Sequence, residues 1–175
     1  DGTGILGGTD YGVARYVDTN KYIAANHIRL AVNLTGDDGT ADVIAFANSV
    51  VVANRLLPDT GFESTGYTVS SEFAYYDGWR IIEHDRYVTD VTGDGRPEVI
   101  GFKDNEVLYS LNTGDNGIFE RETDWPGAAA LFGNDWDGLA NPRFTGDVNG
   151  DGIADLIGIA NDAVIVEFSA LIDVL

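Results

Sequence analysis

A period of 57 residues constrains the fold of this chain more than any other feature of its sequence. Aromatic residues recur at this interval, each seven positions before an arginine, in the pairs Tyr22 and Arg29, Trp79 and Arg86, and Trp136 and Arg143. An acidic loop follows each arginine: "NLTGDDGTAD" at 33–42, "DVTGDGRPEV" at 90–99 and "DVNGDGIADL" at 147–156. Each loop leads into an apolar run, "VIAF", "VIGF" or "LIGI". Three copies at one period predict a repeat architecture built from one supersecondary unit.

Each unit has the pattern of short β-strands joined by tight turns. "RYVTDV" and "NEVLYSLN" alternate apolar and polar residues, and "EVIGF" is typical of a buried strand. The nearest approach to a helical stripe, "AAALFGNDW" at 128–136, is broken by a glycine and an Asn-Asp pair. We therefore predict an all-β chain of β-propeller blades, each made of four antiparallel strands.

The period divides the chain, residues 1–175, into three repeats of one propeller domain. Residues 26–82 form the first repeat, 83–139 the second and 140–175 a partial third, while 1–25 match the outer part of a blade that closes with the C-terminal strands. Propellers need about four to eight blades, so three cannot close a ring. Either self-association, with a dimer making six blades, or the rest of a longer polypeptide would complete the ring.

The composition of the chain restricts the classes of partner that it is expected to bind. The chain carries 10 lysine and arginine residues against 29 acidic ones, a net charge of −19, which disfavours nucleic acid. No stretch is long and apolar enough to span a membrane, so we expect no membrane insertion. There are no cysteines, and the first residue is Asp1 rather than methionine. We expect a processed or segmental chain and a secreted, extracellular protein.

The acidic loops have the oxygen pattern of a calcium site. Alternating side-chain oxygens, a glycine for the sharp turn, a carbonyl at the seventh position and a closing carboxylate suit a hard cation, and no nitrogen or sulfur ligand is offered. The candidate ligands are Asp147, Asn149, Asp151, Ile153 (carbonyl) and Asp155 in the third loop, Asp90, Thr92, Asp94, Arg96 (carbonyl) and Glu98 in the second, and Asn33, Thr35, Asp37 and Asp42 in the first. The alternative is a hairpin turn without an ion. We expect both, with Ca²⁺ clamping the hairpin in a structural role.

The segment "GWRIIEHDRYVTDVTGDGRPEVIGF" (78–102) strongly resembles the repeat of the Psathyrella velutina lectin-like β-propeller family, whose loops are of the FG-GAP, integrin-like type. "NPRFTGDVNGDGIADLIGI" (141–159) and "NHIRLAVNLTGDDGTADVIAF" (26–46) match it less closely. The resemblance implies a propeller that binds sugars such as N-acetylglucosamine or fucose in pockets between adjacent blades, with calcium in some loops. Tyr22 replaces the family tryptophan in the first copy, and Asn141 replaces the histidine in the third. The family's usual ring has about seven blades in one chain, so working pockets are expected at only some interfaces.

A sugar site needs aromatic faces for C–H groups and polar partners for hydroxyls. The candidates are Trp79 with Tyr75, Tyr76, His84 and Arg86, then Trp136 with Asn134, Asp135 and Arg143, and finally Tyr22 with His27 and Arg29. The alternative is structural, with each tryptophan packed between blades and each arginine paired with an acid.

Catalysis is not expected, because the clustered acids belong to the calcium-like loops and the histidines recur as repeat positions. The sequence predicts a multivalent carbohydrate-binding lectin that binds glycans or glycoproteins. The alternative is a calcium-stabilised, integrin-like propeller that mediates protein–protein adhesion without a sugar site.

Overall fold

The structure, a computed structural model, describes residues 27–36, 39–57, 61–62, 66–104, 106–114, 119–120, 123–125, 136 and 140–169. The expected closing segment 1–25 lies outside these residues. So do four of the candidate site residues, Tyr22, Asp37, Asn134 and Asp135.

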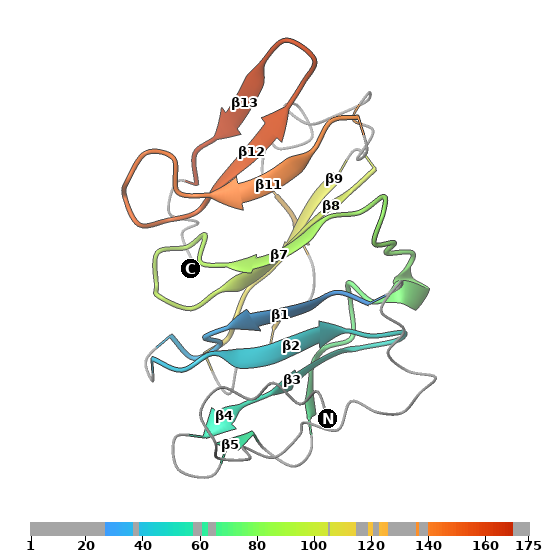
Figure 1. The fold of residues 1–175 in the computed structure, drawn as a ribbon, viewed down its shortest axis with the longest axis vertical. Helices are drawn as coiled ribbons and strands as arrows, with labels where there is room; N and C mark the ends of the chain where they lie inside the picture. The colour runs from blue at the N-terminus through green and yellow to red at the C-terminus, as the bar shows by residue number, and fades with distance from the viewer. Residues whose placement is uncertain are drawn as a thin grey trace, which may run out of the picture.

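Two four-stranded antiparallel sheets and one three-stranded sheet make up the fold (Figure 1). Sheet 1 has the order β1-β2-β3-β6, with β1 (Arg29–Val32), β2 (Asp42–Phe46), β3 (Val51–Asn54) and β6 (Tyr67–Ser70). A small hairpin of β4 (Leu56–Leu57) and β5 (Gly61–Phe62) interrupts it before β6.

Sheet 2 repeats this plan, with β7 (Arg86–Thr89), β8 (Glu98–Lys103), β9 (Glu106–Ser110) and β10 (Thr123–Asp124) in spatial order. Sheet 3 consists of β11 (Arg143–Gly146), β12 (Asp155–Ile159) and β13 (Val164–Glu167). Within the described residues the one helix is a 3₁₀ turn, η1 (Tyr75–Asp77). No described helix is long and apolar enough to cross a membrane.

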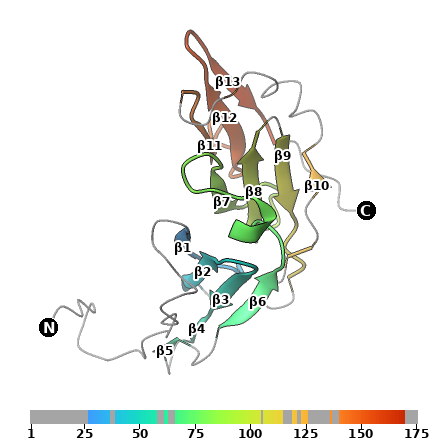
Figure 2. The same ribbon diagram turned by 90° about the vertical axis from the view of Figure 1, so that its right-hand side faces the viewer.

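The sheets follow one another with their first strands side by side. Strand β7 lies between β1 and β11, and Figure 2 shows these three strands along one side of the molecule, with β6 and β10 on the other side. The hydrophobic core fills the two spaces between neighbouring sheets. Phe46, Trp79 and Val99 belong to the first core, and Phe102 and Leu156 to the second.

This layering explains why the apolar runs do not alternate with polar residues. On β8, Val99 enters the core shared with sheet 1, while its neighbour Ile100 enters the core shared with sheet 3. A strand buried on both faces needs apolar residues at successive positions. The predicted all-β fold of antiparallel sheets is thereby confirmed. The number of blades and the closure of a ring remain predictions.

Candidate functional site

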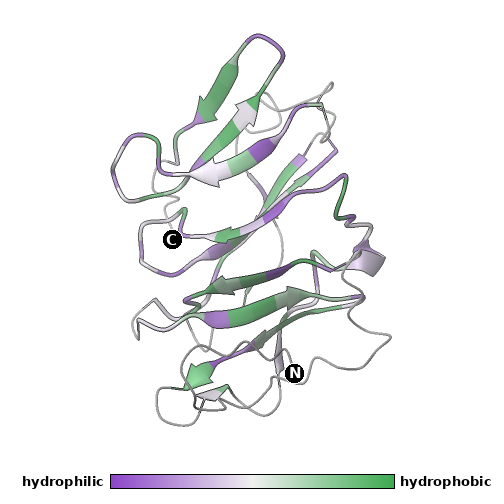
Figure 3. Cartoon of the chain, viewed as in Figure 1, coloured by the Kyte–Doolittle hydropathy of each residue, from purple (hydrophilic) through white to green (hydrophobic). Residues whose placement is uncertain are grey.

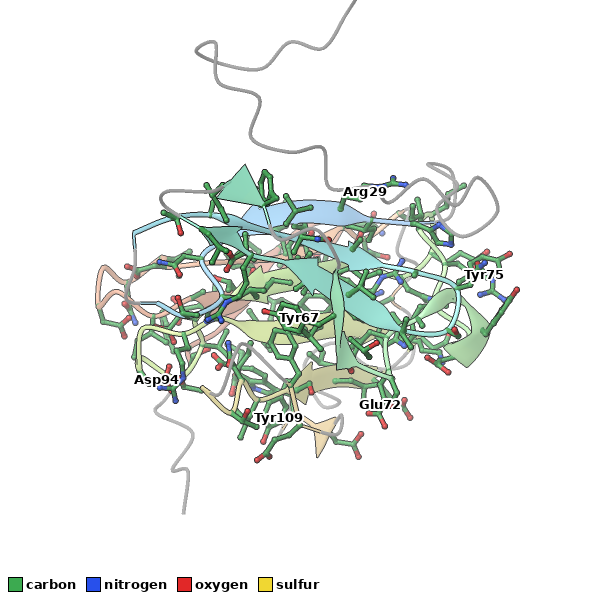
Figure 4. All side chains as sticks on the ribbon, turned by 90° about the horizontal axis from the view of Figure 1, so that it is seen from below. Arg29, Tyr67, Glu72, Tyr75, Asp94 and Tyr109 are labelled. Atoms are coloured by element: carbon green, nitrogen blue, oxygen red, sulfur yellow. The ribbon has the colours of Figure 1, made fainter. Side chains whose placement is uncertain are left out.

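Tyr75, one of the predicted sugar residues, lies at the opposite rim of the sheets from the acidic loops. The segment joining β6 to β7, residues 71–85, is called the β6–β7 connector. Figure 4 places its Tyr75 at one rim and Asp94, in the second acidic loop, at the other, as Figure 1 does for η1 and the loops. The connector and the acidic loops are therefore separate regions of the molecule.

Local hydrogen bonds set the shape of the connector. The Ala74 N–H donates to Asp77 Oδ2 at 3.1 Å, and η1 is followed by Gly78, whose φ of 92° lies in the left-handed region that glycine tolerates. The backbone N–H groups of Tyr75 and Tyr76 donate to the carbonyls of Ala47 and Asn48, at 3.0 and 2.7 Å. The turn between β2 and β3 thus holds both tyrosines in place.

Tyr75 and Tyr76 face different surroundings. The Arg80 guanidinium carbon lies 4.0 Å from the centre of the Tyr75 ring, and the Arg80 side chain also donates to the Tyr75 and Trp79 carbonyls. Such stacking fixes a cation on an aromatic face. Tyr76 is 71% exposed. It is the aromatic ring of the connector most open to a ligand.

His27 supports this junction from sheet 1. Its side chain is buried, and Nε2 lies 2.9 Å from Asn48 Oδ1. The His27 ring also meets the edge of Tyr75, with centroids 6.4 Å apart. His27 therefore touches the residues that position the tyrosines.

The contacts of Trp79 match the structural alternative, in which the tryptophan packs between neighbouring sheets. It is 1% exposed and lies against Phe73, with ring centroids 4.9 Å apart, in the core between sheets 1 and 2. Gly101 on β8 makes room for it, because a Cβ there would lie 2.2 Å from Trp79 Cη2. The equivalent Trp136 is half-buried against the core between sheets 2 and 3. Contact of either indole with a sugar stays a prediction.

His84 links the connector to the β8–β9 turn. The Arg80 N–H donates to His84 Nδ1 at 3.1 Å, so the proton of the neutral ring sits on Nε2, which lies 3.7 Å from Asp104 Oδ1. Burial lowers the pKa of His84 below its ordinary value, although Asp104 opposes the shift. The Asp104 side chain itself is 78% exposed. The neutral His84 ring therefore directs an N–H group toward Asp104, whose carboxylate is accessible to solvent.

The repeated arginines join neighbouring sheets. Arg86 Nη1 donates to the Phe73 carbonyl at 2.9 Å, and its guanidinium lies over the Phe46 ring. Arg143 likewise lies over a phenylalanine ring, Phe102, one sheet later, but its Nη1 donates to the Asp104 carbonyl in the β8–β9 turn at 3.1 Å. Burial lowers the pKa of Arg86 to about 10. Arg29, which starts β1, is exposed, and its Nη1 lies 3.4 Å from the His27 carbonyl.

The acidic loops keep their shape through internal hydrogen bonds. Asp147 accepts the N–H groups of Gly150 and Gly152, at 2.6 and 2.9 Å, and these bonds lower the pKa of its carboxyl. Asp90 accepts from Gly93 and Gly95 in the same way, at 2.7 and 2.8 Å. In the first loop, Asn33 Oδ1 accepts from the backbone of Thr35 and Gly36. All three loops therefore share the hydrogen bond from a glycine N–H three residues after the first loop residue.

The closing acid of each loop has a role that the sequence reasoning missed. Asp42, Glu98 and Asp155 are at most 1% exposed, although the sequence predicts only a metal-binding role for each. Asp155 accepts N–H groups from Val148 and Ser169, both at 3.0 Å, and Asp42 accepts from Leu34 and Leu56. Burial raises the pKa of Glu98 to about 7. The carboxylates of these acids therefore hold the loop against the sheet by accepting backbone hydrogen bonds. Their position as the first residue of β2, β8 and β12 is the signal that could have revealed it.

The donor set of the third loop suits a hard cation. Asp147, Asn149 and Asp151 are exposed and offer only oxygen among their acceptor atoms, and the Ile153 carbonyl belongs to the same turn. Both carboxylate oxygens of Asp155 already accept an N–H group, so each could offer a cation only its second lone pair. In the second loop, Asp94 is paired with the Arg96 side chain, which competes with a cation. Among the described residues, no group of three or more acidic, histidine or cysteine side chains is arranged to hold a metal.

Comparisons with known proteins agree with the sheet architecture. The family described as FG-GAP-like repeat matches residues 90–158, from the second acidic loop into β12. The solved structure of an Agrocybe aegerita lectin, described for specific recognition of non-reducing terminal N-acetylglucosamine, is similar at 31% identity with a TM-score of 0.75. The similarity covers 85% of this chain and 36% of the lectin chain, so this chain spans about a third of the lectin's length.

A chain in the crystal structure of TcdB2-TccC3-Cdc42 is also similar, with a TM-score of 0.64 at 19% identity over 84% of this chain and 7% of that one. At this identity the likeness concerns the fold alone. No curated protein matched the sequence. The chain therefore has a lectin-like fold of antiparallel sheets, and residues 90–158 have the pattern of FG-GAP-like repeats.

Proposed function

We propose that this chain is a carbohydrate-binding protein of the lectin type, without enzymatic activity, which contacts glycans at the junctions between neighbouring propeller blades. The carrying observation is the similarity to a lectin over 85% of the chain. A second observation supports the proposal: the junction between sheets 1 and 2 carries an exposed aromatic ring, Tyr76, and an exposed carboxylate, Asp104.

The junction offers both chemistries that a sugar requires. Tyr76 supplies an open aromatic face for the C–H side of a pyranose ring, and Asp104 supplies acceptors for hydroxyl groups. Lys103 Nζ donates to the Asp77 carbonyl at 3.0 Å, which brings the β8–β9 turn carrying Asp104 against the segment carrying Tyr76. Asp104 and Tyr76 therefore border one junction. Trp79 supports it from the core beneath.

The proposed ligand is a terminal sugar such as N-acetylglucosamine or fucose. The recognition of terminal N-acetylglucosamine by the similar lectin supports the first of these. One junction offers little contact area, so useful strength would come from several junctions that engage a glycan surface together. This requirement fits an extracellular protein that meets glycoproteins.

We also propose that Ca²⁺ binds the third and second acidic loops. The ion would neutralise clustered carboxylates and hold the hairpin at the rim opposite the sugar junction. Its role is structural.

Titration calorimetry with N-acetylglucosamine and with fucose, together with a glycan array, tests the sugar site. Tyr76→Ala should weaken binding about tenfold, the effect expected from loss of one stacked ring, and Asp104→Asn should weaken it as well. Val148→Ala is the matched control, because Val148 is 51% exposed but belongs to the third acidic loop. An array without any bound glycan would refute the proposal and favour the protein-adhesion alternative.

A further inference from the structure

The first acidic loop differs from the other two at its opening residue. In the second loop, Asp90 uses both carboxylate oxygens, since Oδ1 accepts the N–H of Gly93 and Oδ2 that of Gly95, at 2.7 and 2.8 Å. Asp147 uses both of its oxygens in the same way in the third loop. The first loop opens instead with Asn33, whose amide has one oxygen and one nitrogen.

The oxygen of this amide is engaged within the loop, but its nitrogen is not. Asn33 Oδ1 accepts the N–H groups of Thr35 and Gly36, at 3.2 and 2.9 Å, and it also accepts the Thr35 hydroxyl at 3.2 Å. Among the residues that the structure describes, Asn33 Nδ2 makes no hydrogen bond, and it is not one of the buried polar atoms that lack a partner. The Nδ2 atom is therefore accessible to solvent.

The sequence around this amide is a glycosylation motif. Asn33-Leu34-Thr35 is the one Asn-x-Ser/Thr triplet in the chain, and such triplets accept N-linked glycans where they lie on surface loops. Leu34 is fully buried in the core between sheets 1 and 2, which anchors the triplet, while its two polar neighbours are only half-buried. The equivalent triplet of the second loop, Asp90-Val91-Thr92, has the threonine but begins with an acid. The acceptor amide therefore occurs in the first repeat alone.

We propose that Asn33 is the acceptor of an N-linked glycan, an inference that rests on the proposed extracellular location of the chain. The donor is an oligosaccharide carried on a polyprenyl pyrophosphate, which chains meet as they enter the secretory pathway. Asn33 Nδ2 forms a bond to the anomeric carbon of the first sugar, while the bond between that carbon and the pyrophosphate oxygen breaks. The pyrophosphate leaves with the electron pair, and Nδ2 loses one of its two protons.

A glycan at this position is compatible with both proposed sites. The loop between β1 and β2 lies at the rim opposite η1, so the glycan leaves the ring of Tyr76 uncovered (Figure 1). The amide also provides one oxygen fewer than the acids that open the other loops. Calcium and the glycan are therefore expected in different loops.

Expression of the full chain behind a secretion signal in a eukaryotic host tests the proposal. The intact mass of the secreted protein should exceed the sequence mass by that of one glycan, and peptide N-glycosidase should remove the excess and convert Asn33 to aspartate. Asn33→Asp should lack the glycan but keep the turn, because an aspartate opens the other two loops. Thr35→Val should also lack the glycan, and Thr35→Ser, the matched control, should retain it.

Wild-type protein secreted without a glycan by cells that glycosylate a control protein would overturn the proposal, as would a glycan that persists in Thr35→Val. The melting temperature should not fall when the glycan is present, because Nδ2 is accessible in the folded loop. A glycosylated form that melts several degrees below the enzymatically deglycosylated one would contradict this placement. The mass is read independently of sugar binding. A chain that carries the glycan but binds no sugar would support this inference and refute the proposed function alone.

Discussion

At the scale of single residues, buried polar and aromatic side chains hold the sheets in their positions. Trp79 fills the space above Gly101, and Arg86 reaches back from sheet 2 to the Phe73 carbonyl. These contacts lie beside the proposed sugar junction. The residues that shape the junction and the residues that would touch a ligand are therefore different groups.

Gly101→Ala should destabilise the protein by about 1–3 kcal/mol, because the new methyl group would overlap the Trp79 ring. Urea unfolding measures the change. Trp79→Phe removes the outer atoms of the indole, so the double variant should recover part of the loss. Gly146→Ala is the control, because its Cβ would lie 3.6 Å from the nearest atom outside its chain neighbours. Equal losses at Gly101 and Gly146 would contradict the packing argument.

His84 should make stability depend on pH. Burial lowers its pKa in the folded protein below the ordinary value of 6.5, against the opposing effect of Asp104 and Glu83 and with a smaller contribution from Lys103. Between the folded and unfolded pKa values the unfolded chain binds more protons, so this contribution to stability is complete above pH 6.5 and is lost as pH falls below it. Urea unfolding at pH 7.5 and pH 5.5 compares the wild type with His84→Asn, the residue found at position 141 of the next repeat. If the stability difference between pH 7.5 and pH 5.5 were the same in His84→Asn as in the wild type, His84 would be excluded as the cause of the pH dependence.

At the scale of elements, each repeat contains a loop that is held at both ends. Asp147 and Asp90 close their turns by accepting glycine N–H groups, and Asp155 ties the loop to Ser169 beyond β13. Hydrogen bonds within the chain therefore define the shape of the turn. A cation would add its contacts to these hydrogen bonds.

Asp155→Asn should destabilise the protein by about 1–3 kcal/mol even with a chelator present, because an amide offers a single acceptor oxygen to two N–H groups, one buried and one partly buried. Thermal or urea unfolding measures the loss. Asp162→Asn is the control, since Asp162 is an exposed residue of the β12–β13 turn. A loss that occurs only in added calcium would assign Asp155 to the metal alone.

Calcium should raise the melting temperature by several degrees relative to chelator, because an ion that binds only the folded loop stabilises the folded state. Asp151→Ala should abolish most of the increase while changing little in chelator, since Asp151 is exposed. Calorimetry measures both. Identical melting with calcium and with chelator would leave the loops as turns without a metal.

At the scale of the whole molecule, the sheets repeat one plan but differ in how their outer edges are covered. Val107 on β9 is 3% exposed, whereas Val164, at the same repeat position on β13, is 65% exposed, and Figure 3 shows that β13 is hydrophobic along most of its length. The exposed β13 edge is a place where a further sheet, from a second copy or from the rest of a longer chain, could continue the series. If two copies join there, more junctions of the kind formed by sheets 1 and 2 come together in one particle. Self-association and multivalent binding are then linked.

Val164→Lys should leave the monosaccharide affinity unchanged but weaken binding to a glycan-coated surface, because a charge on an edge strand opposes strand addition. Calorimetry gives the first quantity and surface binding the second. Tyr76→Ala is the complementary variant, since it should weaken both. A Val164→Lys protein that retains full surface binding would separate glycan recognition from assembly.

The sequence by itself determined the period, the sheet elements and the turns, because these depend on short-range patterns. Alternating and continuous apolar runs predicted β7, β8 and β9, and Asp-Gly loops predicted the hairpins. The tertiary structure decided the roles of side chains, because those depend on partners far along the chain. The hydrogen bond between Ser169 and Asp155 joins residues 14 positions apart in the sequence, and the one between Arg143 and Asp104 joins residues 39 positions apart. The difference between Val107 and Val164 is likewise invisible in the sequence, since it arises from which strand lies beside each one.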